Sequence, residues 1–99
     1  MKVLALLGIA QAGGRLVSGN SACEEALQKD RVYLLVFAHD ASDNVKRRFL
    51  TRAARKGIPT IEMATKESLG KAIGKPDRAV IAVCDPAFAK ALQSAAESD

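Results

Sequence analysis

The residues best suited to chemistry fall in three short segments, and their groups suit binding better than bond breaking. Ser18-Gly19-Asn20-Ser21 forms a turn in front of a predicted helix. A helix N-terminus presents unpaired N–H groups and the positive end of the helix dipole, a combination that favours phosphate. Gly19 lets the backbone approach a ligand closely, and Asn20 and Ser21 have side chains that reach base edges or ribose hydroxyls. The segment predicts a nucleic-acid contact in which Ser21 also caps the helix.

The other two segments flank the apolar runs of the chain. His39 and Asp40 follow the run from 32 to 38, and the loop 75–78 precedes the run from 79 to 84. In sheets with parallel strands, ligands approach the carboxyl ends of the strands. There His39 can stack on a base and Asp40 can accept a hydrogen bond from an exocyclic amine, although Asp40 could instead simply open the next turn. The loop 75–78 adds two cations.

The sequence shows no set of side chains that could act together in catalysis. The chain has no GxxxxGK[ST] phosphate loop and no GxGxxG after a strand. Ser18 and Ser21 have no nearby base of the nucleophile-elbow type. His39 and Asp40 could form a general base with its orienting acid, but adjacent residues rarely point at each other and no nucleophile accompanies them. We therefore expect no enzymatic activity and no cofactor.

The sequence also does not indicate a metal site or a membrane-spanning segment. Cys23 and Cys84 are too few for a disulfide scaffold or a structural zinc site, and His39 is the only histidine. We interpret both cysteines as small buried hydrophobes. No apolar run approaches the roughly twenty residues that a membrane span needs, and the apolar start of the chain lacks a signal-peptide cleavage site. We expect no metal site, no membrane association and a cytoplasmic location.

The positive charge of the protein is local. The formal net charge is +4, yet the segment 44–56 contains six lysines and arginines and no acid. The rest of the chain is therefore slightly acidic. Such a concentration suits a surface that faces a polyanion, and an ordinary solvated helix face would explain it as well.

The elements that must position these groups alternate between helices and strands. Helical spacing and end signals predict helices over 3–12, 21–29, 43–56, 65–74 and from 86 to the frayed C-terminal residues. Extended segments are expected at 16–17, 32–38, 60–64 and 79–84. Ser21 and Glu24 match a capping box, and the other predicted caps are Ser42 or Asp43, Thr65 and Asp85. The final helix is expected to pack through Ala87, Phe88, Ala91, Leu92 and Ala95.

These elements indicate an α/β protein. The runs 32–38 and 79–84 are continuous and apolar, which is typical of strands that are buried on both faces of a sheet. Buried strands separated by helices predict a three-layer α/β/α sandwich with a small sheet of about four strands. The length of 99 residues predicts a single domain over 1–99.

Four segments also carry a resemblance to a known family: LLGIAQAGGRLVSGNSACEEAL, VYLLVFAHDAS, GIPTIEMATKESLGKAIGK and RAVIAVCDPAFAKAL. They resemble the kink-turn-binding ribosomal protein superfamily, the L-seven-Ae family, and within it the YlxQ-like bacterial branch. The most specific pieces are LVSG, LGKAIGK and the strand that ends in Ala38-His39-Asp40. The resemblance implies a mixed four-stranded sheet and binding to sharply bent, internally looped RNA with tandem sheared G·A pairs.

The resemblance implies that RNA is contacted by the same three segments. It places contacts on Gly19, Asn20 and Ser21, on His39 and Asp40, and on Lys75, Asp77 and Arg78. Where the family's strong binders carry Asn-Glu-x-x-Lys at the second helix, this chain has Ser21, Ala22 and Glu25. A carboxylate at Glu25 would repel phosphate. His39-Asp40 also replaces a common Glu-Asp pair, so the standard kink-turn contact set is incomplete.

The leading hypothesis is a noncatalytic RNA-binding protein that is associated with the ribosome or translation. We expect a monomer that binds structured RNA, with ribosomal RNA and ribosomal or translation-factor proteins as candidate partners. The candidate RNA-binding residues are Arg15, Gly19, Asn20, Ser21, His39, Asp40, Lys46, Arg47, Lys75, Asp77 and Arg78. A second hypothesis is a protein-interaction module whose basic helix 44–56 binds an acidic partner. A third is a small-ligand or nucleotide-binding enzyme with its site at His39 and Asp40.

Overall fold

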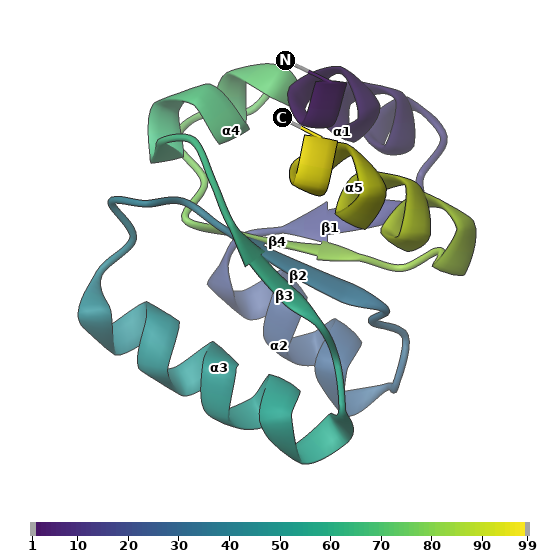
Figure 1. Cartoon of the computed structure of the whole chain (residues 1–99). Helices are drawn as coiled ribbons and strands as arrows, with labels where there is room; N and C mark the ends of the chain where they lie inside the picture. Colours follow the sequence, from purple (N-terminus) through teal and green to yellow (C-terminus); the bar gives the residue numbers. More distant parts are fainter. Residues whose placement is uncertain (1, 99) are drawn as a thin grey trace.

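The computed structural model describes residues 2–98, in which helices lie on both faces of a four-stranded sheet. In chain order the elements are α1 (Lys2–Ala12), β1 (Leu16–Ser18), α2 (Asn20–Gln28), β2 (Leu34–Phe37), α3 (Asp43–Lys56), β3 (Thr60–Glu62), α4 (Lys66–Ala72), β4 (Val80–Val83) and α5 (Pro86–Ser98). Figure 1 shows α1, α4 and α5 on one face of the sheet and α2 and α3 on the other. The predicted three-layer α/β/α sandwich is confirmed.

The sheet is mixed, as the resemblance implied. Its strand order is β1-β4-β2-β3, in which β2 and β3 are parallel and β4 is antiparallel to both β1 and β2. The carboxyl ends of β1, β2 and β3 therefore lie at the same edge of the sheet as the start of β4. The loops that follow or precede these strand ends meet at that edge.

The two central strands supply the core on both faces of the sheet. Every residue of β2 and of β4 is buried. Because side chains alternate along a strand, Leu34 and Val36 pack with α1, α4 and α5, whereas Leu35 and Phe37 pack with the α2 and α3 layer. Phe49 of α3 is fully buried in the second cluster. This double burial explains why both strands are apolar without interruption.

Three predicted helix caps are confirmed. A side-chain oxygen accepts a hydrogen bond from a backbone N–H three residues later in each case: Ser42 from Val45 at 3.2 Å, Thr65 from Ser68 at 3.1 Å and Asp85 from Phe88 at 2.9 Å. Gly57 ends α3 in the left-handed conformation that glycine favours. Local sequence signals thus set the limits of α3, α4 and α5.

The predicted capping box at the start of α2 is wrong. The helix begins at Asn20, its N-cap is Gly19, and no side chain caps it. Gly19 has φ of 91° and ψ of 161°, a conformation open to glycine, and this starts the helix earlier than expected. Glu24 turns instead toward α3, where its Oε1 lies 3.2 Å from Nε of Arg48. Ser21 lies exposed in the first turn.

Smaller differences concern packing. In α5 the buried residues are Ala89, Leu92 and Ala95, whereas Ala87 is exposed. Cys23 is buried as predicted, but Cys84 is only half-buried because it follows the last residue of β4. Within residues 2–98, no helix is both long and apolar enough to cross a membrane.

Candidate nucleic-acid interface

Backbone and side-chain hydrogen bonds join the segment 18–21 to the segment that contains the loop 75–78 and the start of β4. The Nε of Arg78 donates to Oγ of Ser18 at 3.0 Å. The N–H of Gly19 donates to the carbonyl of Val80, also at 3.0 Å. The turn that opens α2 and the loop that precedes β4 are therefore in direct contact.

His39 and Asp40, which follow β2, are joined to the loop 75–78 through the first residue of α4. The backbone N–H of Lys66 donates to Oδ1 of Asp40 at 2.8 Å. The carbonyl of Lys66 in turn accepts from the N–H of Arg78 at 3.0 Å. All three segments thus form one continuous surface, which we call the three-loop surface (residues 19–21, 39–40 and 75–78).

The start of α2 leaves backbone donors unpaired at this surface. The N–H groups of Asn20, Ser21 and Ala22 have no hydrogen-bond partner among the described residues. In α3, α4 and α5, by contrast, a capping side chain accepts a hydrogen bond from a backbone N–H of the first turn. Unpaired amides at the positive end of a helix attract anions. The α2 N-terminus can therefore hold an anionic group, which is the chemistry that the sequence predicted there.

A hollow lies beside these amides, between the first turns of α2 and α3. Its volume is about 310 Å³, and its lining residues are Asn20, Ser42, Asn44, Val45 and Arg48. The two amide side chains and the guanidinium group of Arg48 can donate hydrogen bonds to a base or a phosphate. The sequence singled out Asn20 but missed Asn44 and Arg48, because a helical pattern does not show that these turns of α2 and α3 adjoin.

His39 and Lys46 are engaged with each other and with Glu62. The Nζ of Lys46 donates to the carbonyl of His39 at 2.8 Å and lies 3.0 Å from Oε1 of Glu62. Nδ1 of His39 lies 3.2 Å from Oε2 of the same carboxylate. The hydrogen bond from Lys46, followed by that from His39, lowers the pKa of Glu62. Lys46 therefore helps to hold the loop 38–42, and its charge is balanced within the protein.

Asp40 and Arg78 also have positioning roles. Asp40 anchors the first residue of α4, so at least one of its carboxylate oxygens is already engaged. Arg78 is half-buried, and its Nη1 donates to the carbonyl of Asp77 at 3.1 Å. Lys75 and Asp77 are exposed, and their side chains have no partner between residues 2 and 98. The loop 75–78 therefore offers one cation that is fixed in place and one that is free.

Gly70 fixes the position of this loop, and the sequence analysis missed its role. A Cβ atom at Gly70 would lie 2.1 Å from the carbonyl oxygen of Pro76, so no other residue fits without moving the loop. The N–H of Lys75 donates to the carbonyl of Gly70 at 2.8 Å. A glycine inside a predicted helix is a recognised sign of close backbone approach, and it could have indicated this contact.

Two predicted site residues lie away from the three-loop surface. Arg15 precedes β1 at the opposite edge of the sheet, where its Nε lies 3.8 Å from Oδ2 of Asp85. Arg47 lies on the exposed side of α3. The structure therefore brings Gly19, Asn20, Ser21, His39, Asp40, Lys46, Lys75, Asp77 and Arg78 to one edge and leaves Arg15 and Arg47 outside it.

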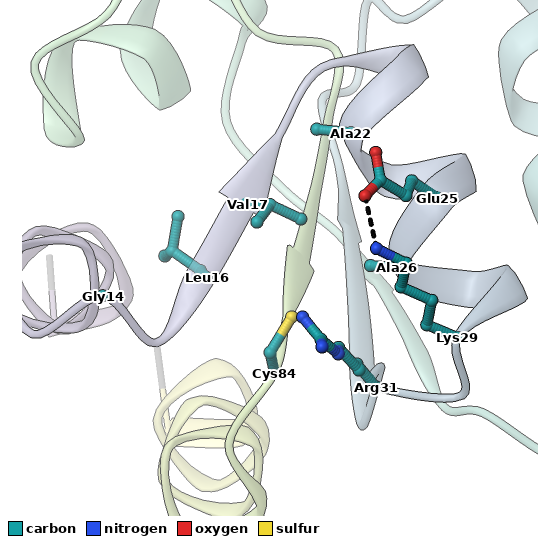
Figure 2. A pocket seen from close by; sticks show the side chains of 9 residues that line it. All are labelled: Gly14, Leu16, Val17, Ala22, Glu25, Ala26, Lys29, Arg31 and Cys84. Atoms are coloured by element: carbon teal, nitrogen blue, oxygen red, sulfur yellow. Dashed lines mark hydrogen bonds and ion pairs between the residues drawn. The ribbon is translucent and has the colours of Figure 1, made fainter.

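Glu25 borders a separate hollow of about 210 Å³ between α2 and the edge strand β1 (Figure 2). Its Oε1 accepts from Nζ of Lys29 at 2.7 Å, and this hydrogen bond lowers the pKa of Glu25. Ala22, Arg31 and Cys84 line the same hollow. The carboxylate that was expected to repel phosphate is thus partly offset by its neighbour. In the described part of the chain, no group of three or more His, Cys, Asp or Glu side chains could hold a metal ion.

Comparisons with known proteins identify relatives of this chain. The chain is 31% identical over 94 residues to the RNA-binding protein YlxQ of Bacillus subtilis (strain 168), which covers 95% of this chain and 94% of the relative. It is 28% identical over 89 residues to the RNA-binding protein YlxQ of Enterococcus faecium, covering 90% and 85% of the two chains.

Solved structures show the same fold. A protein of unknown function from Bacillus halodurans C superposes with a TM-score of 0.90 at 33% identity, with 94% of each chain covered. The Giardia lamblia 15.5kD RNA binding protein superposes with a TM-score of 0.80 at 15% identity, covering 98% of this chain and 86% of that one. Residues 1–93 match the model of the ribosomal protein L7Ae/L30e/S12e/Gadd45 family. The chain therefore belongs to the ribosomal protein L7Ae/L30e/S12e/Gadd45 family.

Proposed function

We propose that this protein is a noncatalytic RNA-binding protein that grips structured RNA of the kink-turn type with the three-loop surface. The observation that carries the proposal is the joining of three sequence-distant segments beside the unpaired amides of α2. The names of the YlxQ relatives add independent support. In this proposal the whole chain acts as one RNA-binding domain and as a cytoplasmic monomer, in association with the ribosome or the translation machinery.

The roles of the residues follow from their positions. The α2 amides hold a phosphate of the bent strand, and Asn20 donates to an exposed base edge or ribose. His39 stacks at the opposite side of the surface. Arg78 supplies a guanidinium group held by Ser18, so little conformational entropy is lost when it pairs with phosphate.

The test compares two RNAs by fluorescence anisotropy. One is a kink-turn, and the other has its sheared G·A pairs replaced by Watson–Crick pairs. We expect preferential binding of the kink-turn, and losses on the order of tenfold for Asn20→Ala and Arg78→Ala, since each removes a polar contact. Lys90→Ala, at an exposed position of α5, is the control and should bind as the wild type does.

Folding must be checked for Arg78→Ala, because Arg78 also contacts Ser18. Asn20 is exposed in the first turn of α2, so its replacement should leave the fold intact. Equal affinity for the two RNAs would contradict kink-turn recognition. Unchanged affinity in both variants would contradict the assignment of the three-loop surface.

A further inference from the structure

The structure divides the six cations of the segment 44–56 into two groups. Three form ion pairs: Lys46 with Glu62, Arg48 with Glu24 and Lys56 with Asp30. The side chains of Arg47, Arg52 and Arg55 have no hydrogen-bond or ion-pair partner among residues 2–98. The excess charge of α3 thus resides on three arginines, which we call the α3 arginine face (Arg47, Arg52 and Arg55).

Helix geometry places these arginines on one side of α3. At about 100° and 1.5 Å per residue, they span about 140° around the axis and about 12 Å along it. The buried side of the helix carries Phe49 and Ala53. Arg47 and Arg55 are exposed, and Arg52 is half-buried toward α2. The three guanidinium groups therefore form a positively charged strip on one side of the helix.

A hollow lies at the far end of this strip. It has a volume of about 240 Å³, and it is lined by Leu27, Gln28, Arg52, Arg55 and Lys56. Two members of the α3 arginine face thus border a single concave site. A guanidinium group can form two parallel hydrogen bonds with a phosphate, so this hollow can receive a phosphodiester.

The strip is continuous with the three-loop surface. α3 follows β2 and precedes β3, and these two strands are parallel. The helix must therefore run from the three-loop edge of the sheet to the opposite edge, along the outside of the molecule (Figure 1). At its start, Lys46 contacts the carbonyl of His39. A rigid ligand that leaves the three-loop surface on this side passes over the arginines.

We propose that the α3 arginine face is a second RNA contact, which binds the backbone phosphates of a double-stranded stem extending from the RNA on the three-loop surface. The inference rests on the proposed function and adds that the RNA target needs a stem on this side. An acidic polypeptide fits less well, because protein hot spots combine arginines with aromatic anchors, and α3, which lies wholly within the described residues, exposes no aromatic side chain. Thr51 is the exposed residue that lies between Arg47 and Arg55 on the helix surface, whereas the exposed Leu50 lies about 60° beyond Arg47, outside the α3 arginine face.

The experiment uses the full chain and three kink-turn RNAs. One has minimal stems, and the other two extend either stem by about ten base pairs. The test variant is R47Q/R52Q/R55Q. The matched control is K2Q/K71Q/K90Q, which removes the same charge from exposed positions on α1, α4 and α5. Thermal unfolding establishes that both variants fold.

For the wild type, we expect one extended RNA to bind more tightly and with a steeper salt dependence than the minimal RNA. R47Q/R52Q/R55Q should lose this gain, with a slope of log K against log salt that is smaller by about 2 to 3, because each phosphate contact contributes about 0.9. It should bind the minimal RNA as the wild type does. K2Q/K71Q/K90Q should keep the gain.

Other results would overturn the proposal. It fails if neither extension helps the wild type, or if R47Q/R52Q/R55Q weakens all three RNAs equally, and in both cases kink-turn binding itself still stands. Poly-glutamate serves as the probe for an acidic polypeptide. If R47Q/R52Q/R55Q binds all three RNAs as the wild type does but loses binding to poly-glutamate, the α3 arginine face binds acidic polypeptides instead. If the wild type binds none of the three RNAs, the proposed function fails as well.

Discussion

Gly19 shows how one residue controls what α2 offers to a ligand. Its φ of 91° and ψ of 161° lie in a region that only glycine occupies without strain. A Cβ atom there would have no contact closer than 3.9 Å, to Nε of Arg78, so the cost of a side chain comes from the backbone. The backbone conformation of Gly19 thus begins α2 without a capping side chain, which leaves the first N–H groups of the helix open to a ligand.

We predict that Gly19→Ala lowers the free energy of unfolding by about 1–3 kcal/mol. Denaturant titration measures this change. Gly13→Ala is the matched control, because Gly13 has no positive φ and its new Cβ would meet only ordinary contacts; its effect should be small. Equal losses in the two variants would show that the backbone of Gly19 carries no special strain.

Glu25 is the residue at which a single charge should alter RNA affinity. It lies about 7.5 Å along the α2 axis from Asn20, within the Debye length of about 8–10 Å at physiological salt. Its carboxylate would therefore repel a phosphate bound at the α2 amides, and the ion pair with Lys29 would only partly offset this repulsion.

We predict that Glu25→Lys raises RNA affinity roughly two- to fourfold at low salt, as expected for a two-unit change of charge at this range. Anisotropy titrations at several salt concentrations measure it. Glu97→Lys is the control, because it makes the same change of charge at an exposed position of α5. The placement of phosphate at α2 would be refuted if both variants gained equally, since the gain would then reflect net charge alone.

At the scale of elements, the cluster of His39, Lys46 and Glu62 ties β3 to the start of α3 and to the end of β2. The lowered pKa of Glu62 makes this tie dependent on pH. A carboxyl group whose pKa is lowered in the folded state stabilises the protein above its ordinary pKa of 4.5. That stabilisation disappears as the pH falls through the lowered value.

Glu62→Gln should therefore have a lower melting temperature than the wild type at pH 7, with the difference shrinking below about pH 4.5. Thermal melts from pH 7 to pH 3 provide the measurement. Glu67→Gln is the control, because Glu67 is exposed on α4 and its side chain has no ion pair within residues 2–98. A difference that stays constant with pH would contradict the role of the ion pairs.

Gly70 couples α4 to the loop 75–78, since the two backbones meet there. We predict that Gly70→Ala costs about 1–3 kcal/mol of stability, as overpacking does, because its Cβ would collide with the carbonyl of Pro76. RNA binding should fall too, as the loop moves. Lys71→Ala, at an exposed position of the same helix, should leave both properties near wild-type values. A stabilised Gly70→Ala would mean that the loop is free to shift.

The elements were predictable because their signals are local. Caps such as Ser42 and Thr65 act within three residues, and the apolar runs of β2 and β4 record burial directly. The direction of strand pairing leaves no such local record, and the mixed sheet was expected only from the family resemblance. The predicted capping box is wrong because Gly19 begins the helix at Asn20, which leaves Ser21 inside the first turn, and Glu24 pairs with Arg48 on another helix.

The candidate site was predictable only in part, for the same reason. The three segments were visible as turns and strand ends. The contacts that join them, through Lys66, Ser18 and Gly70, connect residues that are 26 or 60 positions apart or depend on backbone approach. The six cations of the segment 44–56 looked alike in sequence. Only the fold shows which of them are neutralised.

At the scale of the whole molecule, the sheet separates two hydrophobic cores. Cys23 belongs to the core between the sheet and the α2 and α3 layer, whereas Cys84 is half-buried beyond the end of β4. Burial raises the pKa of the Cys23 thiol to about 12 and also raises that of Cys84. Because the thiolate is the reactive form, both thiols are slow to react, and Cys23 is protected by its position as well.

We predict that a thiol reagent at pH 8 modifies Cys84 in the folded protein, and that it reaches Cys23 only through global unfolding. In Cys84→Ala, the labelling rate of Cys23 should rise with denaturant in parallel with global unfolding. Cys23→Ala provides the reference rate for Cys84, which should change little before the unfolding transition. Rapid labelling of Cys23 in the absence of denaturant would instead reveal local opening of the α2 and α3 layer. In that case bound RNA should slow the labelling directly, because α2 and α3 carry the proposed RNA contacts. If labelling is instead limited by global unfolding, bound RNA slows it only by stabilising the whole fold.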